Sequence, residues 1–181
     1  MRYPDGHNDA VRARIVEVAS RALRRDGIDA VSIPKLMKLA GLTHGGFYVH
    51  FKNRDDLVTA AVAHSATESA FSDGSSAQEA FGKYLSKEHV SHPEMGCVVA
   101  ALGIEGTRQR GRVRRAFADA ARGLIRGVEK KLHPKGGPAT ISDEALEKAS
   151  QIVGAVVLAR LLDDDALAER LLSTAKARMS R

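Results

Sequence analysis

The sequence predicts an all-α protein of about nine helices, in which a three-helix N-terminal unit is joined through a fourth helix to a larger helical bundle. Apolar residues recur at helical spacing along most of the chain, and no alternating run is long enough for a strand. Between residues 31 and 57 a glycine separates two short helical segments, which is the pattern of a helix-turn-helix. We expect two domains, residues 1–55 and residues 56–181.

The composition favours a soluble protein with a basic surface. The chain has 181 residues and one cysteine, so no disulfide can form within it, which fits a reducing cytoplasm. No apolar run approaches the roughly 20 residues that span a bilayer, and the N-terminus lacks the apolar stretch of a signal peptide. The net charge of +6 indicates an anionic partner without distinguishing nucleic acid from acidic lipid. We therefore expect a cytoplasmic protein with no membrane partner.

Local signals place three helices in the N-terminal unit. Residues 9–26 carry apolar side chains at helical period and end at Gly27. Ser32 is placed to cap a second helix, and Gly41 supplies the positive φ that ends it. Thr43 is placed to cap a third helix, whose other positions divide into a polar stripe and a stripe with two phenylalanines. Leu42 and Phe47 on either side of this cap can form a hydrophobic staple, so the third helix is predicted to be oriented as well as started.

The residues around the third helix have alternative explanations. Gly45 and Gly46 each cost about 1 kcal/mol relative to alanine in a helix. Either the backbone there approaches another molecule closely, or two helices of the motif pack closely against each other. Asn53 offers an N-cap for a long fourth helix ending near Phe71. Arg54 beside it is either a phosphate contact or a solvated surface charge.

Residues 40–57 read A-G-L-T-H-G-G-F-Y-V-H-F-K-N-R-D-D-L. Together with the preceding helices, they resemble the DNA-binding domain of the tetracycline-repressor (TetR) family of transcriptional regulators, over roughly residues 9–60. The resemblance implies phosphate contacts by Ser32, Lys35, Thr43, Tyr48, His50 and Lys52. It places His44, Gly45 and Gly46 nearest the base edges. The family more often has Ser-Lys where this chain has Asn53-Arg54, a change that keeps both the cap and the charge.

The remainder of the chain is expected to be a helical effector-binding and dimerisation bundle. The helix that ends near Leu162 is apolar on more than one side, whereas the last helix carries a single apolar stripe. Two such helices from each of two subunits would form a four-helix dimer interface, and the alternative is a core pair buried inside a monomer. The predicted interface residues are Val153, Val156, Val157, Leu161, Leu167, Leu171 and Leu172.

A pocket for a small hydrophobic effector is expected between residues 77 and 132. Its predicted lining is Phe81, Tyr84, Leu85, His89, Met95, Cys97, Val98, Ala101, Ile104, Phe117 and Leu124. Ordinary core packing is the alternative for each of these residues. Aromatic residues make up 4% of the chain, which argues against a pocket built for large planar cations.

Two further clusters also have alternative interpretations. Glu88, His89, His92, Glu94 and Cys97 lie close together in the sequence, so a metal site or a reactive thiol is an alternative to an organic ligand. The arginines of residues 108–115 are either a solvated turn or an auxiliary contact to DNA or to an acidic partner.

The sequence shows no catalytic constellation. The seven histidines are scattered, and neither a glycine-rich phosphate loop nor a nucleophile elbow occurs, so we predict no enzyme and no cofactor. The predicted function is a homodimeric DNA-binding repressor, released from a pseudo-palindromic double-stranded operator by a small hydrophobic effector. The alternatives are a thiol or metal sensor of the same fold acting through Cys97, and a basic helical module that binds an acidic protein or a membrane.

Overall fold

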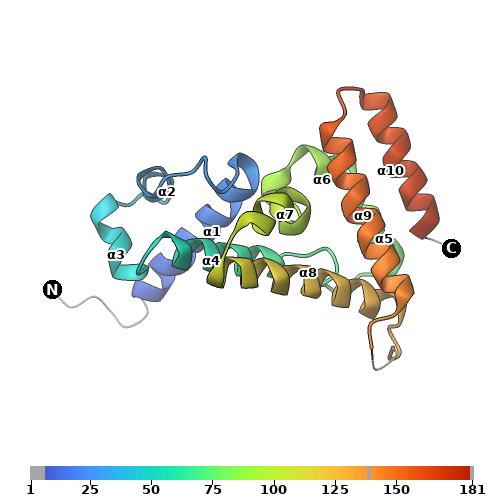
Figure 1. The fold of residues 1–181 in the computed structure, drawn as a ribbon, viewed down its shortest axis with the longest axis horizontal. Helices are drawn as coiled ribbons and strands as arrows, with labels where there is room; N and C mark the ends of the chain where they lie inside the picture. The colour runs from blue at the N-terminus through green and yellow to red at the C-terminus, as the bar shows by residue number, and fades with distance from the viewer. Residues whose placement is uncertain (1–6, 138–139, 180–181) are drawn as a thin grey trace.

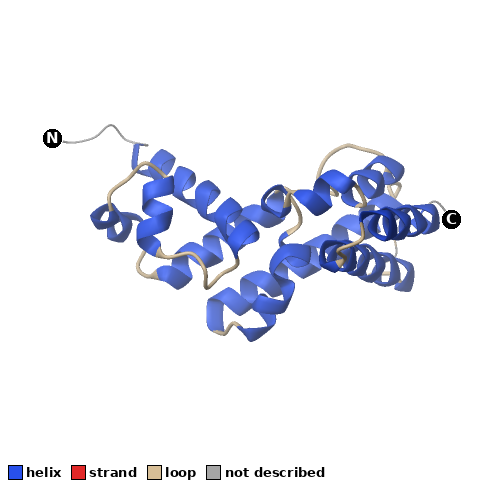
Figure 2. Ribbon diagram, turned by 90° about the horizontal axis from the view of Figure 1, so that it is seen from above, coloured by secondary structure: helices blue, strands red, loops and turns tan. Residues whose placement is uncertain are grey.

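The computed structural model of the chain describes residues 7–137 and 140–179, and every regular element in these ranges is a helix. Figure 1 shows an elongated molecule, with the N-terminal helices at one end and the pair α9 (Asp143–Leu161) and α10 (Asp165–Met179) at the other. The long helix α8 (Gly111–Leu132) runs between the two ends. The view from above shows helices and loops alone in the described part of the chain (Figure 2), which confirms the predicted all-α class.

The N-terminal unit follows the predicted order. It consists of α1 (His7–Asp26), α2 (Ile33–Leu39), the 3₁₀ turn η1 (His44–Gly46), α3 (Phe47–His50) and the start of α4 (Arg54–Thr67). The third helix is thus split into a 3₁₀ turn and a single α-helical turn. The glycine pair accounts for the split, because glycine is a poor helix former and tighter 3₁₀ turns are common at helix ends.

Most of the predicted caps of this unit are present. Ser32 Oγ and Asn53 Oδ1 accept backbone N–H groups from the first turns of α2 and α4, at 3.4 and 3.0 Å. Gly41 has a φ of 72°, as expected for the residue that ends α2. The prediction for Thr43 was wrong, because its side chain makes no capping hydrogen bond although it occupies the N-cap position of η1.

The hydrophobic core of the N-terminal unit continues into the bundle. Phe47 and Leu57 are fully buried in it, and so are side chains from α7 (Val98–Arg108) and α8. Leu102 and Phe117 are among these, with 2% and 5% of their surface exposed. A unit of this size buries too little apolar surface to be stable alone, so helices from the second half of the chain complete its core.

A second core lies between α8 and the helices around it. Its helices include α5 (Ala77–Tyr84), α9 and α10, and the short segments α6 (Lys87–Ser91) and η2 (Pro93–Met95) lie between α5 and α7. Phe71, Phe81 and Ile152 are among its most deeply buried side chains.

Two element boundaries differ from the prediction. Helix α4 ends at Thr67, not near Phe71, since hydroxyl groups beyond it bond back to the backbone. Ser72 Oγ donates to the carbonyls of Thr67 and Ser69 at 3.2 and 2.6 Å, and such local bonds compete with a helix. Helix α6 was not predicted; it forms because Ser86 Oγ accepts a backbone N–H at 3.1 Å and so caps a short helix there.

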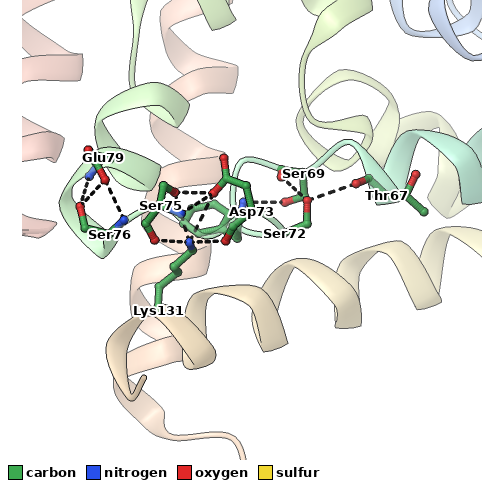
Figure 3. Close-up of polar contacts among 9 residues, drawn as sticks. Thr67, Ser69, Ser72, Asp73, Ser75, Ser76, Glu79 and Lys131 are labelled. Atoms are coloured by element: carbon green, nitrogen blue, oxygen red, sulfur yellow. Dashed lines mark hydrogen bonds and ion pairs between the residues drawn. The ribbon is translucent and has the colours of Figure 1, made fainter. Parts of the chain in front are cut away.

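The loop between α4 and α5 is fixed to α8 by one lysine (Figure 3). The Lys131 ammonium group donates to the Asp73 carbonyl at 2.8 Å, to Ser75 Oγ at 3.2 Å and to the Ser75 carbonyl. The Ser75 hydroxyl and N–H hold the pKa of the Asp73 carboxyl below its usual value. The next residues form a capping box, in which Ser76 Oγ and the Glu79 side chain each bond the other's backbone N–H. The segment after α4 is therefore held in place on α8.

Candidate nucleic-acid interface and ligand cavity

The segment formed by η1 and α3 has one buried side and one exposed side. Phe47 and Phe51 are 0% and 3% exposed, and their rings stack with centroids 5.5 Å apart. Tyr48 and Val49 are 64% and 70% exposed, and the exposed His44 ring lies edge-on to Tyr48 at 6.3 Å. We call η1 and α3 together, residues 44–50, the recognition segment. The phenylalanines fix this segment to the core, so its other side is presented to solvent in a defined orientation.

The two glycines of this segment are not required by packing within the chain. A Cβ atom added to Gly45 would meet no atom within 4 Å, and one added to Gly46 would lie 3.7 Å from Met37 Cε, an ordinary contact. Neither glycine has a positive φ. Of the two explanations for the glycines, close packing between helices of the motif is therefore not supported. Close approach of another molecule is the explanation that remains.

The residues expected to contact phosphate belong to α2, to the recognition segment and to the link that follows it, which lie together at one end of the molecule (Figure 1). Their exposed members are Ser32, Lys35, Thr43, Tyr48 and Lys52, and His50 is half-buried. Lys35 Nζ lies 3.1 Å from a carboxylate oxygen of Asp26, in a pair that is open to solvent. Hydrogen bonds from Arg25 and Lys35 hold the pKa of Asp26 far below its usual value. Exposed pairs of this kind contribute little stability, so the Lys35 ammonium group can exchange this partner for phosphate.

The structure gives Arg54 neither of the two roles considered from the sequence, a phosphate contact or a solvated surface charge. Its guanidinium group is turned toward the loop between α1 and α2, where it donates to the carbonyls of Ile28 and, at 3.4 Å, of Val31. The residue is half-buried. Because these bonds satisfy backbone groups of the chain, Arg54 connects α4 to that loop and is neither directed outward nor a simple solvated charge.

A cavity of about 410 Å³ opens between the end of α4 and the start of α7. Four of the predicted pocket residues line it: Tyr84, His89, Met95 and Cys97. The prediction missed the other residues of its wall, which are Glu68, Ser69, Ala70, Lys83, Ser86, Glu88, His92 and Gly96. This volume is in the range of small-molecule sites, and the wall combines apolar surface with charged groups.

The other predicted pocket residues do not reach this cavity. Phe81, Leu85, Val98, Phe117 and Leu124 are buried in the two hydrophobic cores, Ala101 packs against the first core, and Ile104 is 69% exposed. The prediction was wrong for these residues because helical spacing identifies an apolar face without identifying what that face contacts.

His89 and Cys97 are held together in the wall of the cavity. His89 Nε2 accepts the Cys97 backbone N–H at 2.9 Å, so Nδ1 carries the proton and donates to the Tyr84 carbonyl at 2.6 Å. Burial lowers the pKa of His89, which favours the neutral ring that this arrangement needs. A Cβ on Gly96 would come within 2.3 Å of the His89 ring, so only glycine leaves room for it. The glycine directly before Cys97 is the sequence signal that would have indicated this close approach.

This arrangement is inconsistent with a metal site at the predicted cluster. Within the part of the chain that the structure describes, no group of three or more His, Cys, Asp or Glu side chains is placed to hold a metal ion. His89 uses both ring nitrogens in bonds to the backbone, so no lone pair is left for a metal. His92 and Glu94 pair with each other at 3.1 Å on the exposed side.

One buried polar group beside the cavity lacks a partner. Tyr84 lines the cavity and is 2% exposed, yet its hydroxyl makes no hydrogen bond to any described residue. Burial raises its pKa well above the ordinary value, so the hydroxyl is protonated and has a hydrogen to donate. The hydroxyl oxygen is itself closed off from solvent, so it lies within the cavity wall and is not presented to the open space of the cavity.

The predicted dimer residues divide into surface and core. Leu161 and Leu167 are 76% and 45% exposed, while Val153, Val157 and Leu171 are half-buried. Val156 and Leu172 were assigned wrongly, because they are 0% and 7% exposed and fill the second core. Leu146 and Leu158 on α9, 44% and 54% exposed, belong to the exposed apolar residues of this helix pair but were not predicted.

None of the described helices combines the length and the apolar character needed to span a membrane.

Residues 15–61 match the family of bacterial regulatory proteins, tetR family. Over 49 residues the chain is 41% identical to the HTH-type transcriptional regulator TtgR of Pseudomonas putida, which is 27% of this chain and 23% of TtgR. Over 46 residues it is 39% identical to the regulator AcrR of Shigella flexneri, which is 25% of this chain and 21% of AcrR. The chain thus spans less than a quarter of the length of each of these relatives, and the family match at residues 15–61 contains the helix-turn-helix.

Solved structures resemble nearly the whole chain. The reduced form of NemR from E. coli superposes with a TM-score of 0.73 at 18% identity, covering 94% of this chain and 95% of NemR. A TetR-family regulator from Cytophaga hutchinsonii gives 0.71 at 16% identity, covering 96% and 94%. The regulator FadR from Bacillus subtilis, solved with stearoyl-CoA, gives 0.59 at 15% identity, covering 93% and 95%. At these identities the likeness is one of fold.

Proposed function

The chain belongs to the TetR family of DNA-binding transcriptional regulators, and on that premise we propose that it is a homodimeric repressor, released from a pseudo-palindromic operator by a small hydrophobic effector. The observation that carries the proposal is the recognition segment, which is fixed to the core by Phe47 and Phe51 and exposes His44, Gly45 and Tyr48. A helix held in this way can enter the major groove with a defined side toward the bases. Because its proposed partner is operator DNA, we also propose that the protein acts in the cytoplasm.

Dimerisation is proposed through α9 and α10. Exposed leucines on these helices, among them Leu158 and Leu161, would pack against the same helices of a second copy. Two recognition segments held about one helical turn apart, roughly 34 Å, would read two inverted half-sites. Selection of bound duplexes from a random DNA pool tests this, and we expect inverted half-sites with one fixed spacing. Recovery of unrelated sequences would contradict the proposal.

Effector release is proposed to act through α4. This helix begins at Arg54, directly after the recognition segment, and ends at Thr67, next to the cavity residues Glu68 and Ala70. A ligand that binds one position of α4 more tightly would shift the population of conformations and change the separation of the two recognition segments. Structures of the dimer with and without ligand would show different separations. An unchanged separation together with unchanged DNA affinity would contradict this mechanism.

The cavity favours a small, mainly apolar effector. Its volume of about 410 Å³ is in the range of small-molecule sites, and apolar side chains form part of its wall. The likeness of fold to FadR, which was solved with stearoyl-CoA, supports apolar ligands as a class for this architecture.

Lys52→Ala is expected to weaken binding to all DNA sequences alike. Lys52 is exposed in the link after the recognition segment, and its proposed partner is a phosphate, which carries no sequence information. The slope of log K against log salt should fall by about 0.9 for each phosphate that the protein no longer neutralises, and by about twice that in the dimer. Titrations of labelled DNA, followed by fluorescence anisotropy at several salt concentrations, measure this slope. Lys176→Ala, an exposed lysine on α10, is the matched control. A slope equal to that of the control would remove the phosphate assignment.

Ala70→Trp is expected to fill the cavity and to abolish ligand binding. Ala70 lines the cavity and is half-buried, so an indole ring there occupies the space of a ligand. The probe is the amphiphilic dye 8-anilinonaphthalene-1-sulfonate, whose fluorescence rises when its aromatic rings bind an apolar site. We expect its affinity to fall at least about tenfold, a cost of about 1.4 kcal/mol. Ala177→Trp makes the same change on the exposed surface of α10. Equal dye binding by both variants would show that this cavity is not the ligand site.

A further inference from the structure

Five arginines lie between the end of α7 and the first turns of α8. They are Arg108, Arg110, Arg112, Arg114 and Arg115, and all of them are exposed. Their position works against local stability, because a helix N-terminus favours negative charge, and α8 has no acidic residue in its first turn. The N-cap residue Arg110 also makes no capping hydrogen bond. Helix formation therefore does not explain these arginines.

The fold places this arginine cluster next to the recognition segment. The beginning of α8 lies beside α4 in Figure 1, and the Arg112 guanidinium forms an ion pair with Asp56 in the first turn of α4. The same carboxylate accepts the backbone N–H of Lys52 at 3.1 Å through its other oxygen. A single acidic side chain thus joins the start of α8 to a residue expected to contact phosphate.

A groove of about 440 Å³ runs between these elements. Basic side chains line it from three separate parts of the chain: Arg12 from α1, His50 and Lys52 from around the end of α3, and Arg112 from α8. The Arg12 guanidinium lies over the Phe51 ring at 5.0 Å, which holds it at the edge of the groove. Asp56 is the acidic residue of the lining, so cations outnumber it.

The remaining arginines of the cluster have no neutralising partner in the part of the chain that the structure describes. Within the described residues, no ion pair or side-chain hydrogen bond is formed by Arg108, Arg110, Arg114 or Arg115, in contrast to Arg122 further along α8, which pairs with Asp119 at 2.9 Å. The charge is thus concentrated at the end of α8 nearest the recognition segment. A polyanion that lies along this end of α8 would be attracted by the whole positive charge of the cluster.

We propose that the arginine cluster is a second DNA contact, in which the phosphate backbone flanking each half-site lies over this groove and against the first turns of α8. Arginine suits this task because its planar guanidinium group binds phosphate in a bidentate manner. The contact adds affinity and fixes the register on the duplex, but reads no bases. It is made by the effector-binding bundle itself, so movement of the bundle relative to α4 changes DNA binding directly. The inference rests on the proposed binding of DNA through the recognition segment.

The test is the salt dependence of operator binding by R110Q/R112Q. Because this variant removes two guanidinium groups from each subunit of the dimer, the slope of log K against log salt should fall by up to about 3.6. The affinity should fall at least about tenfold for operator and random duplexes alike. Trimming the base pairs outside the half-sites should weaken the wild-type protein and leave the variant unaffected. R110K/R112K should restore most of the slope.

The matched control is R122Q/R126Q, which removes the same charge from the same helix further from the recognition segment. Equal salt slopes for R110Q/R112Q and this control would overturn the inference. Equal losses of affinity on trimming, for the wild-type protein and R110Q/R112Q, would also overturn it. Both results are expected if the cluster binds an acidic protein. R108Q/R110Q leaves the ion pair to Asp56 intact, so it provides the same readout if loss of that pair prevents folding. A wild-type protein that selects no operator would instead contradict the proposed function.

Discussion

Gly45→Ala is expected to leave the protein folded and to weaken operator binding by about 1–3 kcal/mol, the usual cost of spoiling one close contact with the bases. The added methyl group meets no atom of the free protein, so it finds an obstacle only when a base edge or sugar lies against the backbone. The free protein should become slightly more stable, by about 0.4–1 kcal/mol, because alanine restricts the unfolded chain. Anisotropy titrations and thermal unfolding measure the two effects on the same sample.

Gly123→Ala on α8 is the control for this prediction. Its added Cβ atom also meets nothing within 4 Å, and the residue lies in the bundle, away from the recognition segment. A similar gain in stability with unchanged operator affinity is expected there. Wild-type affinity in Gly45→Ala would mean that this backbone does not approach DNA.

Leu161→Glu is expected to produce a monomer that binds operator at least about 100-fold more weakly. Leu161 is the last residue of α9, is 76% exposed and belongs to the proposed dimer contact, and burying two carboxylates in an apolar interface is costly. Operator affinity falls when the dimer is lost, because two linked recognition segments gain about 10²–10⁴ in affinity from effective concentration. Sedimentation equilibrium gives the oligomeric state, and anisotropy gives the affinity.

Ile104→Glu on α7 separates this effect from the general effect of a new surface charge. Ile104 is 69% exposed and lies outside the helix pair α9 and α10, so this variant should remain dimeric and bind operator normally. If the Leu161→Glu variant remained dimeric, the interface would have to lie on another face of the molecule.

The helix-turn-helix could be predicted from the sequence because its signals are local. The Ser32 and Asn53 caps and the positive φ of Gly41 each depend on a few neighbouring residues, and the structure has all three. Arg54 could not be assigned in this way, because its hydrogen bonds reach the loop at Ile28, far away in sequence. Local pattern shows that a charge is present and leaves its partner undetermined.

The ligand cavity could be predicted only in part, since it depends on which apolar faces meet. Phe117 has the spacing of a pocket residue, but the absence of a side chain at Gly106 lets its ring pack against α7, where a Cβ would lie 2.6 Å from it. The ring therefore fills the first core. Val156 and Leu172 were wrongly assigned to the dimer interface, because one step along a helix turns a side chain by about 100°. Such a turn moves a residue from the dimer surface into the interior.

A single buried guanidinium group connects the reading end of the molecule to the wall of the cavity. Arg24 on α1 is 3% exposed, and it donates to the carbonyl of Gly96 at 2.6 Å and to the Glu68 carboxylate at 2.7 Å. Both acceptors belong to residues that line the cavity. A ligand that moves these two walls apart would lengthen or break the hydrogen bonds of Arg24. Its binding would therefore displace α1 as well as α4. If the effector acts through this cavity as proposed, α1 and α4 would both carry a movement of its walls to the helix-turn-helix.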